Sequence, residues 1–254
     1  MGKSKPRKGK DIEDVAPCEA GPATGPRRVL LLRHGQSASQ ASGEDVPDAP
    51  LSELGERQAQ AWRGQMGAFG AEVVLVSPLR RAVQTACLAF AEDTAPMELC
   101  RFAREKWWQE RSNTMRSLAD MEDLLKTLPR GSEMLGLEEC WTFGDDEPRT
   151  EVCCRRQHLR WEMDGVLSPR LLQRLPGAPA AGRGREEQSV QRLRSVLAAR
   201  GEDVVAVVCH WGVINDLCGA STANAEIIEC ERAQQSGYLR ITKCHRSGTY
   251  EFSS

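Results

Sequence analysis

Two histidines stand at equivalent places in the sequence, each directly after a run of mostly apolar residues. His34 follows the run VLLLR, His210 follows VVAVVC, and a glycine comes within two residues of each. Apolar runs of this length are typical of strands that are buried on both faces of a parallel sheet. The pattern therefore predicts both imidazoles at the carboxyl ends of strands, where open α/β sheets bind their ligands.

Arginines accompany these histidines. Arg33 precedes His34, and Arg81 lies one turn into a helix that is predicted to begin with Ser77 as its N-cap and Pro78 as its first residue. Imidazoles among guanidinium groups favour an anion, in particular a phosphoryl group, because its oxygens suit the donors of arginine. A nearby cation lowers the pKa of a histidine and keeps its imidazole neutral and nucleophilic near pH 7. The predicted chemistry is phosphoryl transfer to a histidine.

The elements that would position these residues alternate along the chain. Strands are expected at the apolar runs VLLL, VVLV and VVAVV and, at a sheet edge, over 238–243. Helices are expected over 52–66, from Ser77 onward, over 115–128, over 152–166, and from Val190 to a stop at Gly201. This order predicts an α/β fold, a three-layer sandwich with a mostly parallel central sheet and helices on both faces.

Two segments fall outside this alternation. Residues 1–26 begin with a basic cluster and continue with Pro, Gly and Ala, which indicates a disordered basic leader before a single domain over 27–254. The tract PGAPAAGRGR at 176–185 indicates a flexible insertion within that domain.

Charge and cysteine content narrow the classes of function. The 34 Lys and Arg residues nearly balance the 36 Asp and Glu residues, so no overall field would recruit nucleic acid or an anionic membrane. The ten cysteines are irregularly spaced and no signal peptide is recognisable, which indicates reduced thiols and a cytoplasmic protein. No apolar run has the length of a membrane span. The expected partner is a small phosphorylated metabolite or a phosphoprotein.

Four blocks of sequence carry a resemblance to a known family. They are LRHGQS around His34, LSELG at 51–55, SPLRRAVQTA from Ser77, and VCHWGVI around His210. Together they resemble the signatures of the histidine phosphatase, or phosphoglycerate mutase-like, superfamily. The resemblance covers roughly residues 28–110 and 187–230.

The resemblance implies a role for each matching residue. His34 would accept the phosphoryl group. The oxygens of that group would be held by Arg33, Arg81 and His210. Arg80 is the alternative to Arg81, but Arg81 stands directly before the alanine of the family pattern.

The same resemblance implies a proton donor for the leaving oxygen, which the family takes from a glutamate after the third strand. We expect Glu105 in this role, with Glu110 as the alternative. The adjacent Trp107 and Trp108 would raise the pKa of the Glu105 carboxyl by desolvating it. No metal or other cofactor is implied, because the arginines supply the positive charge.

Two departures from the mutase pattern favour hydrolysis. Where mutases of the family carry Glu-Arg-x-Tyr-Gly, this chain reads EKWWQERS from Glu105, and where they place an asparagine it has Gln40. Ser37, Gln40 and Arg111 are candidates for substrate contacts. The predicted function is that of a metal-independent phosphomonoester hydrolase, a phosphatase of the histidine acid type. Mutase-type phosphoryl transfer and a non-catalytic module that binds phosphorylated ligands are the alternatives.

Overall fold

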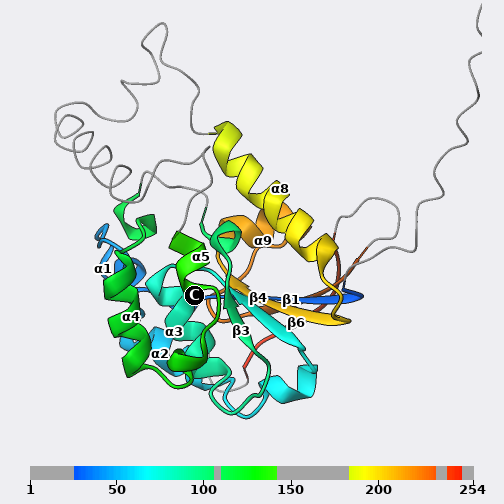
Figure 1. Ribbon diagram of the computed structural model, residues 1–254, viewed down its shortest axis with the longest axis horizontal. Coiled ribbons are helices and arrows are strands. Elements are labelled where there is room, and N and C mark those ends of the chain that lie inside the picture. Colours follow the sequence, from blue (N-terminus) through cyan, green and yellow to red (C-terminus); the bar gives the residue numbers. More distant parts are fainter. Residues whose placement is uncertain (1–25, 106–109, 142–182, 233–238, 248–254) are drawn as a thin grey trace, which may run out of the picture.

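The computed structural model describes residues 26–105, 110–141, 183–232 and 239–247 (Figure 1). The helix expected over 152–166, the first seven residues of the expected insertion and the leader up to residue 25 lie outside these ranges. None of the helices within the described ranges is both long and apolar enough to cross a membrane.

The described strands form one six-stranded sheet in the order β3-β2-β4-β1-β5-β6. Their bounds are Arg28–Arg33 (β1), Val73–Val76 (β2), Met97–Leu99 (β3), Val204–Cys209 (β4), Ile227–Arg232 (β5) and Leu239–His245 (β6). The strands β1 to β4 pair in parallel with one another, whereas β5 is antiparallel to both β1 and β6. The mostly parallel α/β sheet predicted from the sequence is confirmed, and the strand expected over 238–243 is the edge strand β6.

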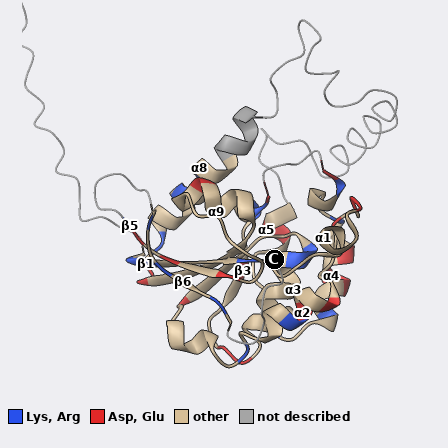
Figure 2. Ribbon diagram, turned by 180° about the vertical axis from the view of Figure 1, so that it is seen from behind, with Lys and Arg blue, Asp and Glu red and all other residues tan. Residues whose placement is uncertain are grey.

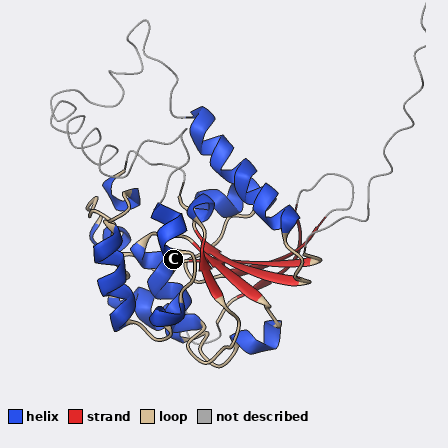
Figure 3. Ribbon diagram, in the orientation of Figure 1, coloured by secondary structure: helices blue, strands red, loops and turns tan. Residues whose placement is uncertain are grey.

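Helices cover both faces of this sheet, and alternate strand residues pack against each layer (Figures 1 and 3). The helices are α1 (Ala38–Ser42), α2 (Glu53–Gln60), α3 (Arg80–Ala89), α4 (Leu118–Thr127), α5 (Leu137–Trp141), α8 (Arg183–Ala199) and α9 (Trp211–Cys218). Leu30 and Leu32 of β1 share a buried cluster with residues of α3, α4 and α5. Val29 and Leu31 share a second cluster with residues of α8 and α9. Successive side chains of β1 point to opposite faces of the sheet, so its apolar side chains pack against the helices on both faces.

Several helix bounds differ from those expected. The helix expected over 52–66 ends at Gln60, and the chain then turns through Gly64, which has a φ of 73°, into the short 3₁₀ helix η1 (Met66–Phe69). Helix α4 begins after Ser117, whose side chain accepts a hydrogen bond from the amide of Asp120. Helix α8 begins at Arg183, so the last three residues of the tract expected as a flexible insertion are helical. Good helix formers follow that start, which favours the helical state.

The start of α3 was predicted wrongly, and the reason concerns the histidines. The helix begins at Arg80 with Leu79 as its N-cap residue, and the side chain of Ser77 does not cap it. The hydroxyl of Ser77 lies 2.7 Å from Nε2 of His210 instead. At the start of α3 a carboxylate accepts the hydrogen bond that a capping side chain would accept: the amide of Arg80 donates to Oδ1 of the buried Asp48 at 2.9 Å.

Basic and acidic residues are interspersed along the described part of the ribbon (Figure 2). This distribution agrees with the near balance of 34 basic and 36 acidic residues in the sequence. Any strong local charge must therefore arise from the grouping of particular side chains, as in the cavity described below.

The turn after β1 packs backbone to backbone against the first turn of α2. A Cβ atom added at Gly55 would lie 2.0 Å from the carbonyl oxygen of Gln36, and one added at Gly35 would lie 2.4 Å from that of Gly55. Neither glycine leaves room for a methyl group. This contact fixes the turn that carries His34 against α2.

We expect Gly55→Ala to lower the free energy of unfolding by about 1–3 kcal/mol, because the backbone must shift to admit the methyl group. Urea denaturation followed by circular dichroism measures this change. Gly201→Ala is the matched control, since a Cβ there meets nothing within 4 Å. Equal midpoints for both variants and the parent chain would contradict the close contact.

Candidate active site

The two histidines lie side by side because they follow neighbouring strands. His34 comes directly after β1 and His210 directly after β4, and the two strands pair in parallel with Arg33 opposite Cys209. The ring centroids are 5.0 Å apart and the ring planes are inclined by 54°. Both imidazoles are buried.

Arg81, in the first turn of α3, joins the two imidazoles. Its Nε donates to Nε2 of His34 and its Nη2 to Nδ1 of His210, both at 3.2 Å. Its remaining donors bind the carbonyl oxygen of Ser112 at 2.7 Å and Oδ1 of Asn113 at 2.6 Å. The structure thus brings Arg81 to both histidines.

The hydrogen bonds define the tautomer of each imidazole. Nδ1 of His34 lies 2.6 Å from the carbonyl oxygen of Gly35 and must carry the proton, because a carbonyl only accepts. This leaves the lone pair of His34 on Nε2, the atom that faces Arg81. His210 has the opposite arrangement, since its Nδ1 accepts from Arg81 and its Nε2 donates to the hydroxyl of Ser77.

Both imidazoles are neutral near pH 7. Burial lowers the pKa of His34 well below its ordinary value, and the charges of Arg81 and Arg33 lower it further. Burial also lowers the pKa of His210, followed by the charge of Arg81. A neutral His34 with its lone pair on Nε2 can act as a nucleophile.

Arg33 adds a second guanidinium to the site. Its Nη1 donates to the carbonyl oxygen of Thr222, while its buried Nε has no hydrogen-bond partner among the described residues. Burial lowers the pKa of this group, while Glu105 and Glu226 act in the opposite direction. Because an arginine stays charged and Arg33 lines the cavity, its guanidinium can donate to an anion there.

Glu105 reaches the site from the segment after β3 and the 3₁₀ helix η2 (Arg101–Ala103). Only 5% of its surface is exposed, and Oε2 accepts from the amide of Gly212, in the first turn of α9, at 3.3 Å. Trp107 and Trp108, expected to desolvate this carboxyl, lie outside the described residues. The described contact therefore ties Glu105 to the turn that follows His210.

Glu110, the alternative proton donor, also reaches the site. Its Oε2 accepts from Nδ2 of Asn113 at 3.1 Å. Burial raises the pKa of this carboxyl, and the charges of Asp45 and Glu105 raise it further. The two glutamates thus stand near enough to each other to interact.

All these groups open into one cavity of about 470 Å³. Its lining comprises Arg33, His34, Ser37, Ser39, Gln40, Gly43, Glu44, Asp45, Arg81, Glu105, Glu110, Ser112, Asn113 and Trp211. His210 lies behind this lining in contact with Arg81. Arg80 and Arg111 do not line the cavity in the described structure.

Ser37 and Gln40 line the cavity but also hold each other. The hydroxyl of Ser37 accepts from the amide of Gln40, and Oε1 of Gln40 accepts from the amide of Ser37, which together form a capping box on α1. Nδ2 of Asn224 donates both to Oε1 of Gln40 and to the carbonyl oxygen of His34 at 3.1 Å. These contacts hold Ser37 and Gln40 in place in the lining of the cavity.

Sequence reasoning missed several polar residues that complete the site. They are Ser112 and Asn113, which bind Arg81, Thr85, whose hydroxyl accepts from the amide of Gly35 at 3.0 Å, and Asn224. Thr85 lies within the SPLRRAVQTA block and could have been found there. Asn113 ends the short 3₁₀ helix η3 (Arg111–Asn113) and Asn224 lies in a turn, and neither belongs to a recognisable motif. Within the described ranges, no group of three or more His, Cys, Asp or Glu residues could hold a metal ion.

Comparisons with known proteins agree on one family and one fold. Residues 29–126 match the family model of the histidine phosphatase superfamily (branch 1), whereas no curated protein sequence matches the chain significantly. A solved structure from Escherichia coli, provisionally described as an α-ribazole-5′-phosphate phosphatase, has a TM-score of 0.52 at 19% identity, over 87% of this chain and 97% of that one.

Two further solved structures have lower scores. A mycobacterial glucosyl-3-phosphoglycerate phosphatase has a TM-score of 0.47 at 19% identity, over 87% of this chain and 97% of its own. A phosphoglycerate mutase from Thermus thermophilus has a TM-score of 0.46 at 18% identity, over 85% and 97%. The segment that matches the histidine phosphatase family model contains His34, Arg81 and Glu105, and the chain shares its fold with the E. coli structure.

Proposed function

We propose that the protein is a phosphomonoester hydrolase that works through a phosphohistidine on His34, with Glu105 as the proton donor. The observation that carries this proposal is the contact of Arg81 with both imidazoles, since it leaves the lone pair of His34 on Nε2 at a cationic site. The match of residues 29–126 to the histidine phosphatase family model supports the same chemistry.

Binding of the phosphoryl group would use the positive floor of the cavity. The guanidinium groups of Arg33 and Arg81, which line the cavity, offer donors to the phosphoryl oxygens. Phosphate would replace His34 as a partner of Arg81, which frees Nε2 for attack. His210 would hold an oxygen of the same group through a ring nitrogen. These contacts stabilise the negative charge on the equatorial oxygens as the transfer proceeds.

In the first step, Nε2 of His34 attacks phosphorus in line with the leaving oxygen, the N–P bond forms and the P–O bond breaks. Glu105 gives its proton to the departing alkoxide, which leaves as an alcohol. In the second step, the Glu105 carboxylate takes a proton from water, whose oxygen attacks phosphorus. The new O–P bond forms, the N–P bond breaks with its electron pair returning to Nε2 of His34, and inorganic phosphate leaves. His34 and the protonated Glu105 are then restored.

The charges at the cavity rim favour hydrolysis over mutase-type transfer. Glu44, Asp45 and Glu110 line the cavity, and its only described cationic lining residues are Arg33 and Arg81. A phosphoglycerate carries a carboxylate and, as the bisphosphate, a second phosphate, which this rim would repel. The substrate would be a phosphomonoester, either a small metabolite or a phosphoprotein, whose remainder tolerates negative charge at the rim.

The nucleophile is tested with His34→Ala, for which we expect a loss of turnover of about 10³-fold or more, because the covalent route itself is removed. Hydrolysis of an aryl phosphate measures turnover, and trapping of an acid-labile, base-stable phosphoenzyme measures the intermediate. His245→Ala is the matched control, since His245 lies on β6 and binds Glu229. Undiminished turnover in His34→Ala would overturn the proposal.

The proton donor is tested with two classes of substrate. We expect Glu105→Gln to lower turnover of an alkyl phosphate by about 10²–10⁴-fold and that of an activated aryl phosphate much less, because an activated leaving group departs without a proton. Glu110→Gln is the matched variant at the same cavity. If Glu110→Gln, and not Glu105→Gln, lowers turnover of the alkyl phosphate much more than that of the aryl phosphate, Glu110 is the proton donor.

The fate of the phosphohistidine is tested with 3-phosphoglycerate and catalytic 2,3-bisphosphoglycerate. We expect little 2-phosphoglycerate, because the acidic rim holds a dephosphorylated anionic product weakly and admits water. Inorganic phosphate should appear from at least one ester in a panel of sugar phosphates, alkyl phosphates and phosphopeptides. Isomerisation that outpaces phosphate release would restore mutase-type transfer with the same His34.

A further inference from the structure

The outer part of the candidate active-site cavity is acidic, in contrast to the buried Arg81 at its inner end. Three carboxylates, those of Glu44, Asp45 and Glu110, line the cavity, and Glu44 and Glu110 are exposed. No ion pair joins any of the three to a lysine or arginine that the structure describes. The described lining therefore lacks a positive group that would balance these carboxylates.

The three carboxylates differ in how they are held. Both oxygens of Asp45 accept hydrogen bonds from backbone amides, those of the two residues that follow Glu110, at 2.9 Å and 2.7 Å. Glu110 accepts a hydrogen bond from Nδ2 of Asn113 at 3.1 Å. The carboxylate of Glu44 has no hydrogen-bond partner among the described residues. Glu44 and Glu110 thus keep oxygens that can accept from a ligand.

A ligand with a positive group would relieve the repulsion among these carboxylates. Burial raises the pKa of the Glu110 carboxyl, and the negative charges of Asp45 and Glu105 raise it further. A phosphoryl group bound at Arg81 would bring more negative charge into the same cavity. Because like charges repel and a cation between them offsets the repulsion, a substrate with a cationic remainder would bind better than a neutral one.

One side chain connects the expected phosphoryl site with the acidic outer part. Oδ1 of Asn113 accepts from Nη2 of Arg81 at 2.6 Å, and Nδ2 of the same amide donates to Oε2 of Glu110 at 3.1 Å. Only the width of a carboxamide therefore separates the Arg81 guanidinium from the Glu110 carboxylate. A ligand that contacts both must carry its positive group on a short spacer next to the phosphoester oxygen.

An indole lines the same cavity. Trp211 is the first residue of α9 and directly follows His210. Its Nε1 donates to Oγ of Ser221 at 3.2 Å, which restrains the ring. The face of an indole attracts ammonium groups through the negative charge of its π system. This aromatic group indicates a cationic ligand independently of the carboxylates.

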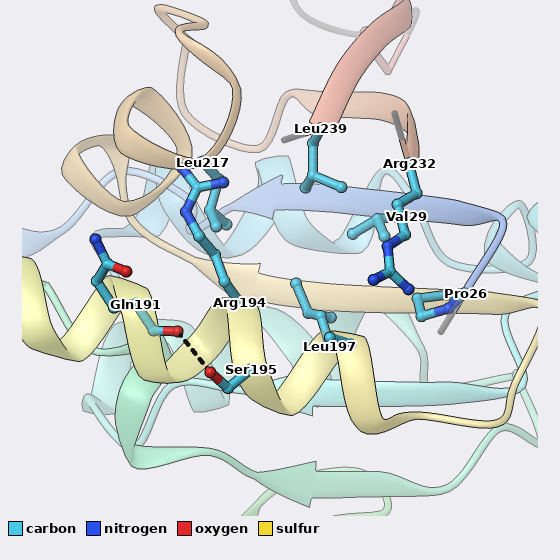
Figure 4. Close-up of a pocket in the computed structure, with 10 residues that line it drawn as sticks. Pro26, Val29, Gln191, Arg194, Ser195, Leu197, Leu217, Arg232 and Leu239 are labelled. Carbon is cyan, nitrogen blue, oxygen red and sulfur yellow. Dashed lines mark hydrogen bonds between the residues drawn. The ribbon is translucent and has the colours of Figure 1, made fainter. Parts of the chain in front are cut away.

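The acidic lining distinguishes this cavity from a second groove of about 250 Å³. Figure 4 shows Arg194 of α8 and Arg232 of β5 among the residues that line this groove. Its described lining includes these two arginines and no acidic residue. A cationic ligand would therefore be drawn to the active-site cavity and repelled by the second groove.

We propose that the substrate is a small phosphomonoester whose alcohol carries an ammonium group on a short spacer. The ammonium group lies among Glu44, Asp45 and Glu110, against Trp211, while the phosphoryl group binds beside Arg81. This inference rests on the proposed function, because it assigns a substrate class to the same cavity. A cavity of about 470 Å³ has the size of a small-molecule site. Hydrolysis would release inorganic phosphate and the ammonium-bearing alcohol.

The test uses pairs of esters that differ in charge but hardly in shape. Phosphocholine is compared with 3,3-dimethylbutyl phosphate, in which carbon replaces the quaternary nitrogen, and phosphoethanolamine with propyl phosphate. We expect kcat/KM of at least one charged ester to exceed that of its neutral partner by about tenfold or more, because several contacts act together. Added salt should lower this ratio, since the outer carboxylates are exposed to solvent.

Variants separate the effect of charge from the acidity of the leaving alcohol, because a substitution in the protein leaves both esters unchanged. Glu44→Gln should lower the ratio about threefold, and Glu44→Gln combined with Glu110→Gln about tenfold. A loss of proton donation would affect both alkyl esters of a pair alike. The matched control is Glu122→Gln, which removes an exposed carboxylate of α4 outside the cavity lining and should leave the ratio unchanged.

An aryl phosphate is the reference for turnover. If it is hydrolysed while both ratios stay near one, or if the Glu44 and Glu110 variants keep the ratios of the parent chain, the substrate class is wrong and the proposed function stands. A lysine-flanked phosphoserine peptide with a higher kcat/KM than either charged ester would overturn the assignment to a small ester. If no ester releases phosphate, the proposed function fails, and this inference fails with it.

Discussion

One buried guanidinium group sets the geometry of the candidate active site. Arg81 is almost fully buried, and a buried charge is tolerated only where its donors are satisfied. Its partners come from three separate parts of the chain, namely the imidazoles of His34 and His210 and the loop at Ser112 and Asn113. Each of these parts must be in place for the others to be satisfied. A phosphoryl group that displaces these contacts would meet donors that are already oriented.

The arrangement of the strands explains how two histidines so far apart in sequence reach this arginine. The parallel pairing of β1 and β4 aligns Arg33 with Cys209, so the residues that follow emerge at the same edge of the sheet. Burial then makes both imidazoles neutral, and Arg81 selects which nitrogen of each ring carries the lone pair. The tautomers follow from fixed carbonyl and hydroxyl partners. In the structure, the neutral imidazole of His34 therefore already has its lone pair on Nε2.

The sequence was sufficient to predict the α/β sheet and the positions of both histidines, because buried parallel strands read as uninterrupted apolar runs. It was insufficient for β5, where the alternation in IIECER is brief and two of its residues are acidic. Asn113 was missed for a different reason: it ends a 3₁₀ helix of three residues and binds Arg81 through a tertiary contact, which leaves no local sequence pattern. The end of α2 was also predicted wrongly. The apolar Trp62 and Met66 suggested that the helix continues, but Trp62 lies in a turn and Met66 in a 3₁₀ helix, and both side chains are nevertheless buried.

Ser77 was wrongly predicted to cap α3, because a tertiary contact with His210 replaces the local hydrogen bond that the sequence suggests. A serine before a proline has the local features of an N-cap, but its hydroxyl here accepts from His210, which fixes the tautomer of that ring. The helix start is served instead by Asp48, a residue 32 positions away from Arg80 in the sequence. Burial raises the pKa of Asp48 to about 6, while Arg81, Arg116 and Arg80 favour its charged form. The carboxylate that anchors α3 thus also balances part of the positive charge around Arg81, and Ser77 is left free to orient a histidine.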